Sequence, residues 1–196
     1  MICKKLLISA LCTVSFLSVY AQTAISGVIN TYTKVSAVDT CKNAVSVTSQ
    51  NAFSKGDEVL LIQMKGAVIN EGQSSVYGNL VNQKSAGLYE INIIDSVFSN
   101  VIYLKNKFIN TYQSDASLQL ITIPKYQNAV VSDTLKAKNW DGTVGGVLIF
   151  RVENELGLLS FIDVSGKGFR GGKANPNPDP NNPCNGILVF RNRYQL

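Results

Sequence analysis

The chain has 196 residues, of which 45% are hydrophobic and 16% charged, with a formal net charge of +5 and no histidine. The absence of histidine excludes Ser-His-Asp and Cys-His nucleophilic catalysis and histidine-ligated zinc. The basic residues are few and scattered, and no nucleic-acid-binding motif occurs, so we predict no nucleic-acid partner.

The first 21 residues have the pattern of a secretory signal peptide. Lys4 and Lys5 supply its positive start, residues 6–17 its apolar core, and Val19-Tyr20-Ala21 a small-x-small cleavage site. The apolar run is shorter than the roughly 20 residues that span a bilayer. We therefore predict cleavage near Ala21 and export to the extracellular space or the cell surface, with no transmembrane segment in the mature chain.

Cleavage changes both the charge and the cysteine content. The mature chain keeps 16 basic against 13 acidic residues, a net charge of +3, and two cysteines, Cys41 and Cys184. A disulfide between them is possible in an oxidising compartment and would stabilise the fold by roughly 4 to 5 kcal/mol in the chain-entropy model. Two unpaired thiols, or a partner for Cys184 outside this chain, are the alternatives. Two cysteines without histidine predict no metal site.

Residues 22–142 show the patterns of β-strands in chain order. A short apolar run, residues 59–64, predicts a strand buried on both faces, and residues 89–93 alternate apolar and polar side chains. Ser99-Asn100 predicts a two-residue turn into a strand at 101–104, and further strands are expected at 118–123 and 129–131. No apolar stripe has the helical period. This all-β pattern predicts a small antiparallel barrel or sandwich.

Residues 143–196 have a different character because they contain a repeat. Gly146-Val-Leu-Ile-Phe-Arg151 returns forty positions later as Gly186-Ile-Leu-Val-Phe-Arg191, five residues before the last residue. We predict strands at 147–152 and 158–164 with a polar turn at 153–155 between them. A proline-rich stretch follows. Repetition at a fixed period favours the first coils of a glycine-rich, β-helix-like solenoid that is truncated at its second unit. One sandwich with two similar core strands is the alternative.

The glycine-rich loop that follows residue 164 has the glycine spacing of a nucleotide-binding motif but not its sequence context. Gly166-x-Gly168-x-x-Gly171 satisfies the dinucleotide fingerprint, but a proline-rich stretch follows it where that fingerprint requires a helix. We therefore predict no cofactor.

A few residues near the repeat are candidates for ligand binding. A basic loop with an aromatic residue suits an anionic sugar or phosphate, and Trp140 suits stacking on a sugar face, although a core position is the simpler interpretation. The candidate ligand-binding residues are Trp140, Asp141, Lys167, Phe169, Arg170 and Lys173. Asp141, Glu153, Glu155 and Asp163 are the carboxylates available for glycoside cleavage, but each also suits a turn or a strand end. We predict no catalytic residues.

Four ordered segments carry a resemblance to a known group of proteins. Residues 56–67 (GDEVLLIQMKGA), 86–90 (AGLYE), 140–146 (WDGTVGG) and 165–172 (SGKGFRGG) are similar to the amino-terminal region of large, glycine-rich, adhesin-like surface proteins exported by the type IX secretion route. The resemblance implies a longer protein with more glycine-rich coils and a carboxy-terminal sorting domain, and it implies the secretion machinery as a partner.

These observations predict an exported, non-enzymatic surface protein whose amino-terminal β module begins an adhesin or scaffold. Glycans or other surface proteins are its expected partners. A polysaccharide-cleaving enzyme on a β-helix and a truncated nonfunctional product are the alternatives.

Overall fold

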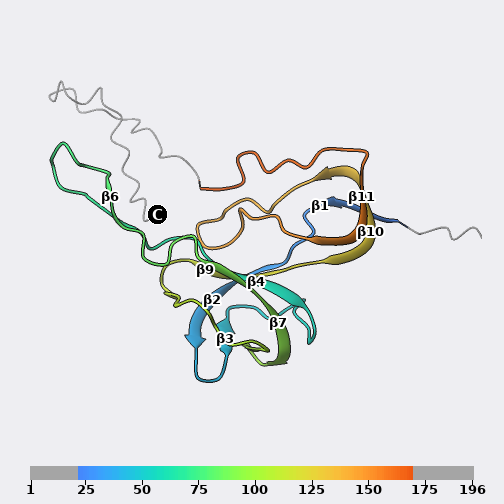
Figure 1. The fold of residues 1–196 in the computed structure, drawn as a ribbon, viewed down its shortest axis with the longest axis horizontal. Helices are drawn as coiled ribbons and strands as arrows, with labels where there is room; N and C mark the ends of the chain where they lie inside the picture. The colour runs from blue at the N-terminus through green and yellow to red at the C-terminus, as the bar shows by residue number, and fades with distance from the viewer. Residues whose placement is uncertain (1–21, 170–196) are drawn as a thin grey trace, which may run out of the picture.

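The computed structural model describes residues 22–169, which form eleven strands and contain no helix (Figure 1). The predicted all-β class is therefore confirmed. Within these residues no helix exists that is long and apolar enough to cross a membrane. The predicted signal peptide, Arg170, Lys173, Cys184 and the second copy of the repeat lie outside the described residues.

Six strands close into an antiparallel barrel, as predicted for this part of the chain. The strands pair in the order β2-β3-β8-β7-β4-β9, and β9 pairs with β2 to complete the circle. Closure leaves no strand edge unpaired. The barrel interior is filled by aliphatic side chains such as Leu61, Ile102 and Leu120, each fully buried. The strands are β2 (Tyr32–Asp39), β3 (Ala44–Val47), β4 (Glu58–Gln63), β7 (Tyr89–Phe98), β8 (Val101–Leu104) and β9 (Leu118–Thr122).

Local signals placed two of these elements correctly. Strand β4 is buried along almost its whole length, as its continuous apolar run predicted. The predicted two-residue hairpin joins β7 to β8, with Phe98 paired to Val101. Ser99 adopts a φ of 49°, the left-handed conformation that tight hairpin turns require.

Strand β7 keeps the predicted alternation but buries its polar side. Glu90 and Asn92 are 7% and 2% exposed, whereas Tyr89 is 62% exposed. Both buried side chains bind backbone groups of the loop after β8: Glu90 accepts from the Ile109 N–H at 3.0 Å, and Asn92 exchanges two hydrogen bonds with Asn106. Buried polar groups are tolerated when they are paired in this way.

A second sheet is entirely parallel. It contains β1 (Thr23–Gly27), β10 (Lys125–Leu135) and β11 (Arg151–Leu158) in the order β1-β10-β11. The whole barrel lies in sequence between β1 and β10, so the chain leaves the parallel sheet, builds the barrel and returns (Figure 1). Strands that return to stack in parallel are the arrangement of solenoid coils. The predicted combination of a small antiparallel barrel with a β-helix-like part is confirmed, except that β1 of the parallel sheet precedes the barrel in sequence.

The parallel sheet changes two details of the sequence-based prediction. Residues 153–155 are not a turn between two strands; they lie inside β11, where Glu155 pairs with Asn128 of β10. The predicted boundary between residues 142 and 143 separates β10 from β11, although these two strands pair. Both differences arise because parallel pairing joins segments that are distant in sequence, which local patterns do not report.

The remaining two strands form a small hairpin outside both sheets. Strands β5 (Val68–Ile69) and β6 (Leu80–Asn82) pair antiparallel and project away from the barrel (Figure 1).

Candidate functional site at the junction of barrel and sheet

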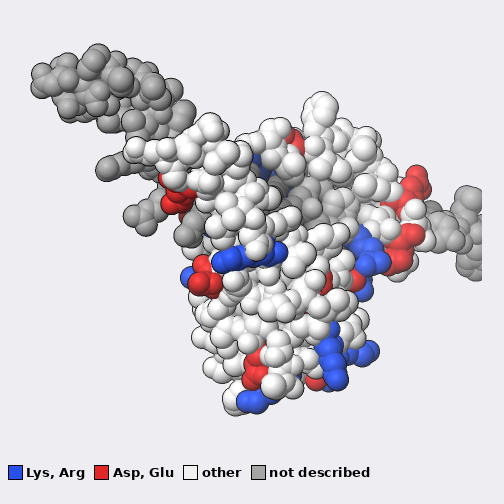
Figure 2. All heavy atoms as spheres, turned by 60° about the vertical axis from the view of Figure 1, so that its left-hand side comes forward, with Lys and Arg blue, Asp and Glu red and all other residues white. Residues whose placement is uncertain are grey.

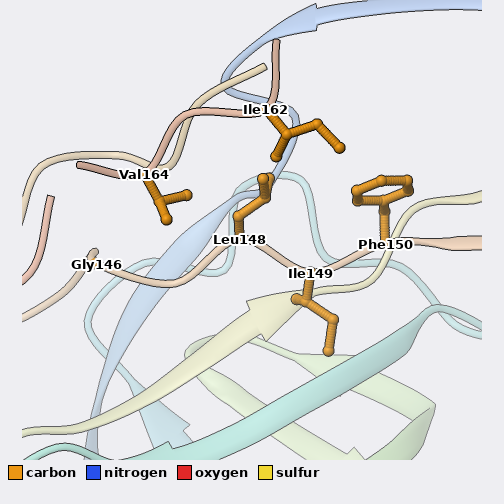
Figure 3. Close-up of a pocket in the computed structure, with 6 residues that line it drawn as sticks. All are labelled: Gly146, Leu148, Ile149, Phe150, Ile162 and Val164. Carbon is orange, nitrogen blue, oxygen red and sulfur yellow. The ribbon is translucent and has the colours of Figure 1, made fainter. Parts of the chain in front are cut away.

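Residues 145–151, which we call the junction segment, lie between the barrel and the parallel sheet. Their side chains alternate between two cores. Val147 and Ile149 pack against Ile121 and its neighbours on the outside of the barrel, whereas Leu148 and Phe150 pack against the core under the parallel sheet. Figure 3 shows Ile149 pointing away from Leu148 and Phe150, toward the barrel strands. The first copy of the repeat therefore joins the two parts of the molecule.

Polar side chains of the barrel hold the backbone of the junction segment at every second residue. Gln119, fully buried on β9, accepts from the Gly145 N–H at 2.8 Å and donates to the Gly145 carbonyl at 3.1 Å. The Tyr32 hydroxyl donates to the carbonyl of Val147. Burial raises the pKa of Tyr32, despite an opposing hydrogen bond from Lys138, so the phenol keeps its proton as a donor. These contacts replace the missing partner strand.

The same pattern continues at the next two alternate positions. Asn30, 6% exposed in the connection from β1 to β2, donates to the carbonyl of Ile149 and accepts from its N–H at 3.3 Å. Arg151 then binds Glu58 of the barrel at 2.8 Å, and Lys125 approaches the same carboxylate at 3.0 Å. The junction is therefore fixed by four successive side-chain contacts.

Glu58 is the charged centre of this junction. Burial by itself raises the pKa of its carboxyl, but the hydrogen bonds and charges of Lys125 and Arg151 outweigh that effect and lower it. Because Lys125 begins β10 and Arg151 begins β11, one barrel carboxylate binds the cations at the paired ends of two parallel strands.

Gly145 is required by the geometry of the junction. Its φ of 110° is a conformation that residues with a side chain rarely adopt, and a Cβ at this position would lie 2.6 Å from the Asn139 carbonyl oxygen.

Trp140 lies where the segments of the resemblance meet. The residue is 5% exposed, and its ring packs edge-on against the ring of Phe169 with centroids 5.1 Å apart. The backbone N–H of Trp140 donates to the Lys167 carbonyl at 2.8 Å. The Lys65 ammonium lies 5.8 Å from the ring centroid. The Gly87 N–H, in turn, donates to the carbonyl of Gln63 at 2.8 Å. All four segments are therefore in one connected set of contacts beside the junction.

The structure gives Trp140 and Asp141 structural roles. Trp140 is 5% exposed, which agrees with a core position, and its role in stacking on a sugar stays a prediction. Asp141 accepts from Thr143 and Val144 and binds Lys138 at 2.8 Å. Burial alone raises the pKa of Asp141, but these hydrogen bonds, led by that of Lys138, hold it well below its usual range. The carboxylate thus fixes the turn before Gly145.

The remaining site residues stay predictions. Lys167 is half-buried and Phe169 is 43% exposed, so both are reachable on the surface beside Trp140. Cys41 is exposed, and its pairing with Cys184 is untested. On the face drawn in Figure 2, basic and acidic side chains are intermixed rather than gathered into one patch.

An apolar hollow lies next to the junction segment, on the side of the parallel sheet. It has a volume of about 430 Å³ (Figure 3). Gly146, Leu148, Ile149, Phe150, Ile162 and Val164 line it, so its walls come from the repeat and from the stretch after β11.

The residues that make the junction were not among the predicted site residues, and Asn30 and Tyr32 lie outside every predicted strand. Glu58 and Gln119, however, are polar residues at the start of, or within, apolar runs that predicted strands. That anomaly was the available signal, because a polar side chain in a buried strand needs a partner.

Comparisons with known proteins add a distant likeness in fold. No known protein family matches the sequence, and no curated protein matches it. The Gp54 tailspike of Acinetobacter baumannii bacteriophage AP22, solved in complex with A. baumannii capsular saccharide, is 14% identical over 67% of this chain and 22% of the tailspike, with a TM-score of 0.37. The tailspike gp49 of Pseudomonas phage LKA1 is 10% identical over 60% of this chain and 20% of the tailspike, with a TM-score of 0.31. The chain thus spans about a fifth of either tailspike, and likeness at this level carries no argument about function.

Proposed function

We propose that this chain is the amino-terminal module of an exported, non-enzymatic surface protein, in which the barrel holds the first coils of an adhesive or scaffolding solenoid. The main support is the junction: three barrel side chains and Asn30, from the connection between β1 and β2, fix the segment that leads into β11, and β11 is the outer strand of the described parallel sheet. A closed barrel gives such a sheet a rigid base from which coils can extend in register.

The export part of the proposal rests on the signal-like first 21 residues and on the resemblance to adhesin-like proteins of the type IX secretion route. The four segments that carry the resemblance are far apart in sequence, but they contact one another around Trp140 in the folded chain. These contacts support the view that the four segments belong to one structural unit.

The enzymatic alternative receives little support from two of its four candidate carboxylates, Asp141 and Asp163. A glycosidase needs a carboxyl group whose pKa is raised so that it can act as a general acid. The pKa values of Glu58, Asp141 and Asp163 are instead lowered: for Glu58 and Asp141, partner hydrogen bonds outweigh burial, and for Asp163 the hydrogen bonds of Ser165 dominate. These shifts suit structural ion pairs and turns.

The experiment uses the encoding organism and the purified mature chain. We expect the amino terminus of the exported protein to begin at Gln22, and antibodies against residues 22–169 to label intact cells. Retention of the protein inside the cell with residues 1–21 uncleaved would overturn the proposal.

The purified chain is also incubated with anionic and neutral polysaccharides, and both retention and newly formed reducing ends are measured.

A matched pair of variants tests the glycan part. Lys167→Ala removes a cation next to Trp140 and Phe169, whereas Lys42→Ala removes an exposed cation on the barrel hairpin. We expect retention of anionic polysaccharide to fall in Lys167→Ala alone, without release of reducing ends in any sample. Release of reducing ends that disappears in Glu153→Gln or Glu155→Gln would favour the enzyme instead.

A further inference from the structure

Equivalent positions on neighbouring strands of the parallel sheet differ sharply in exposure. Val131 on β10 is completely buried, but Leu158, its partner on β11, is 62% exposed. Leu135 is completely buried as well, whereas its partner Ile162 is 44% exposed. On the other side of β10, Ile25 of β1 is only 4% exposed. The apolar core under this sheet is therefore covered at β1 and open at β11.

The open end coincides with the apolar hollow beside the junction segment. Leu148 and Phe150 form one wall and Ile162 and Val164 another (Figure 3). An apolar surface of this kind, next to a strand with an unpaired edge among the described residues, is the binding surface for one more strand.

The sequence contains a segment that matches this surface. Residues 186–191 repeat residues 146–151, so Leu188 and Phe190 correspond to Leu148 and Phe150, the two side chains that point into the hollow. Residues 192–195 do not repeat residues 152–155, but at the same forty-residue offset Leu196 matches Leu156 of β11.

We propose that residues 191–196 bind the open edge of β11 as the next parallel strand of the sheet and that residues 186–190 lie beside residues 146–150, each forty positions after its equivalent. Leu188 and Phe190 fill the hollow, and Leu196 covers Leu156. This proposal deepens the proposed function, on which it rests, by naming the segment that adds the next coil.

Charge complementarity supports this register. It places Arg193 beside Glu153, which is exposed on β11. Parallel neighbours of opposite charge stabilise a pair of strands, while like charges oppose it. The same register puts Arg191 next to Arg151, and the carboxylate of Glu58, 2.8 Å from the Arg151 guanidinium, reduces that repulsion.

The chain between the two strands is long enough for the proposed path. Sixteen positions take the chain from Leu135 to Arg151, and 29 separate Ile162, the partner of Leu135, from Arg191. The additional 13 residues accommodate the proline-rich stretch 175–183 as a loop outside the coil, where prolines without an N–H donor are tolerated.

Hydrogen exchange of the mature chain, residues 22–196, tests the proposal. In a parallel strand, alternate N–H groups point to opposite neighbours, so half of the β11 amides face away from β10. We expect these outward amides to be protected in the unmodified chain. Phe190→Asp and the milder Phe190→Ala are expected to speed their exchange at least 10-fold. Ala174→Asp, a new charge in the stretch before the prolines, is the matched control and is expected to leave β11 unchanged.

Amides of β4 and β9 report separately on the barrel, which both Phe190 variants are expected to leave protected. The proposal is wrong if neither Phe190 variant selectively speeds exchange in β11. It is also wrong if the protection of β11 requires dimer formation, seen as a dependence on protein concentration, because a second copy would then occupy the edge. Either result leaves the proposed function intact, since that proposal fails on cell-surface labelling and signal cleavage instead.

Discussion

In the barrel every strand has two hydrogen-bonded neighbours, because β9 pairs with both β4 and β2. In the parallel sheet β11 pairs with β10 alone among the described strands. The same contrast appears in the side chains: Leu61 and Leu120 in the barrel are fully buried, whereas Leu158 on β11 is 62% exposed. A closed sheet completes its core within itself, whereas an open parallel sheet needs further chain to do so.

The contrast also explains why the junction is polar. Among the described residues no strand pairs with positions 145–150, so side chains of the barrel and of the connection from β1 to β2 supply donors and acceptors in place of a backbone ladder. These contacts orient the first coil, while apolar packing on both sides provides most of the stability.

The largest loss of stability is expected from a substitution in the barrel core. Leu61→Ala removes a fully buried side chain from its centre and leaves a cavity, so we expect the free energy of unfolding to fall by about 2 to 5 kcal/mol. Urea denaturation measures the loss. Leu159→Ala, at a residue 80% exposed just after β11, is the matched control, with an expected change within about 0.5 kcal/mol. Equal losses in the two variants would contradict the contrast between closed and open regions.

A smaller effect is expected when the junction is weakened. Gln119→Ala leaves the N–H and the carbonyl of Gly145 without their side-chain partner in a buried position, at a cost of about 1 to 3 kcal/mol. Gln127→Ala changes an exposed residue of the same type on β10 and is expected to cost little. Hydrogen exchange then locates the change, which should appear in residues 145–151 before it appears in β4. Loss of barrel protection first would contradict the assigned role.

The ion pairs of Glu58 make the junction sensitive to acid. Because partners lower the pKa of Glu58 in the folded state, its contribution to stability is complete above the ordinary value of 4.5 and is lost as the pH falls through the lowered folded value. Glu58→Gln cannot titrate, so we expect its unfolding free energy to depend less on pH in that acidic range. If the unfolding free energies of the variant and the unmodified chain changed equally with pH, this assignment would be refuted.

The smallest effect concerns the exposed ion pair in the barrel hairpin between β2 and β3. Lys42 lies 3.7 Å from Asp39, and both side chains are largely exposed. Asp39 also accepts from the N–H groups of Cys41 and Lys42, so the turn keeps its main contacts without the lysine side chain. Lys42→Ala is therefore expected to change the unfolding free energy by less than about 1 kcal/mol in thermal melts. A larger loss would mean that charge, and not backbone capping, holds this hairpin.

Particular residues show how far local patterns reach. The Ser99-Asn100 turn and the buried run of β4 were predictable because a tight turn and a buried strand each require particular residue types within one short segment. The buried polar face of β7 was not, since Glu90 and Asn92 find their partners in a loop that follows another strand. The interior position of Glu155 within β11 was missed for a similar reason, because its partner Asn128 lies far away in sequence.

The sequence by itself determined the all-β class, the barrel strands β4, β7, β8 and β9 and the repeat that marks the first coil, because side-chain alternation, turn residues and recurrence are local properties; it did not predict β2 and β3. Only the tertiary structure decided that β1 and β10 belong to a parallel sheet with β11, and that Asn30, Tyr32, Glu58 and Gln119 bind alternate positions of the junction segment. Parallel pairing and buried polar contacts join residues many positions apart, so their partners are fixed only when the chain has folded.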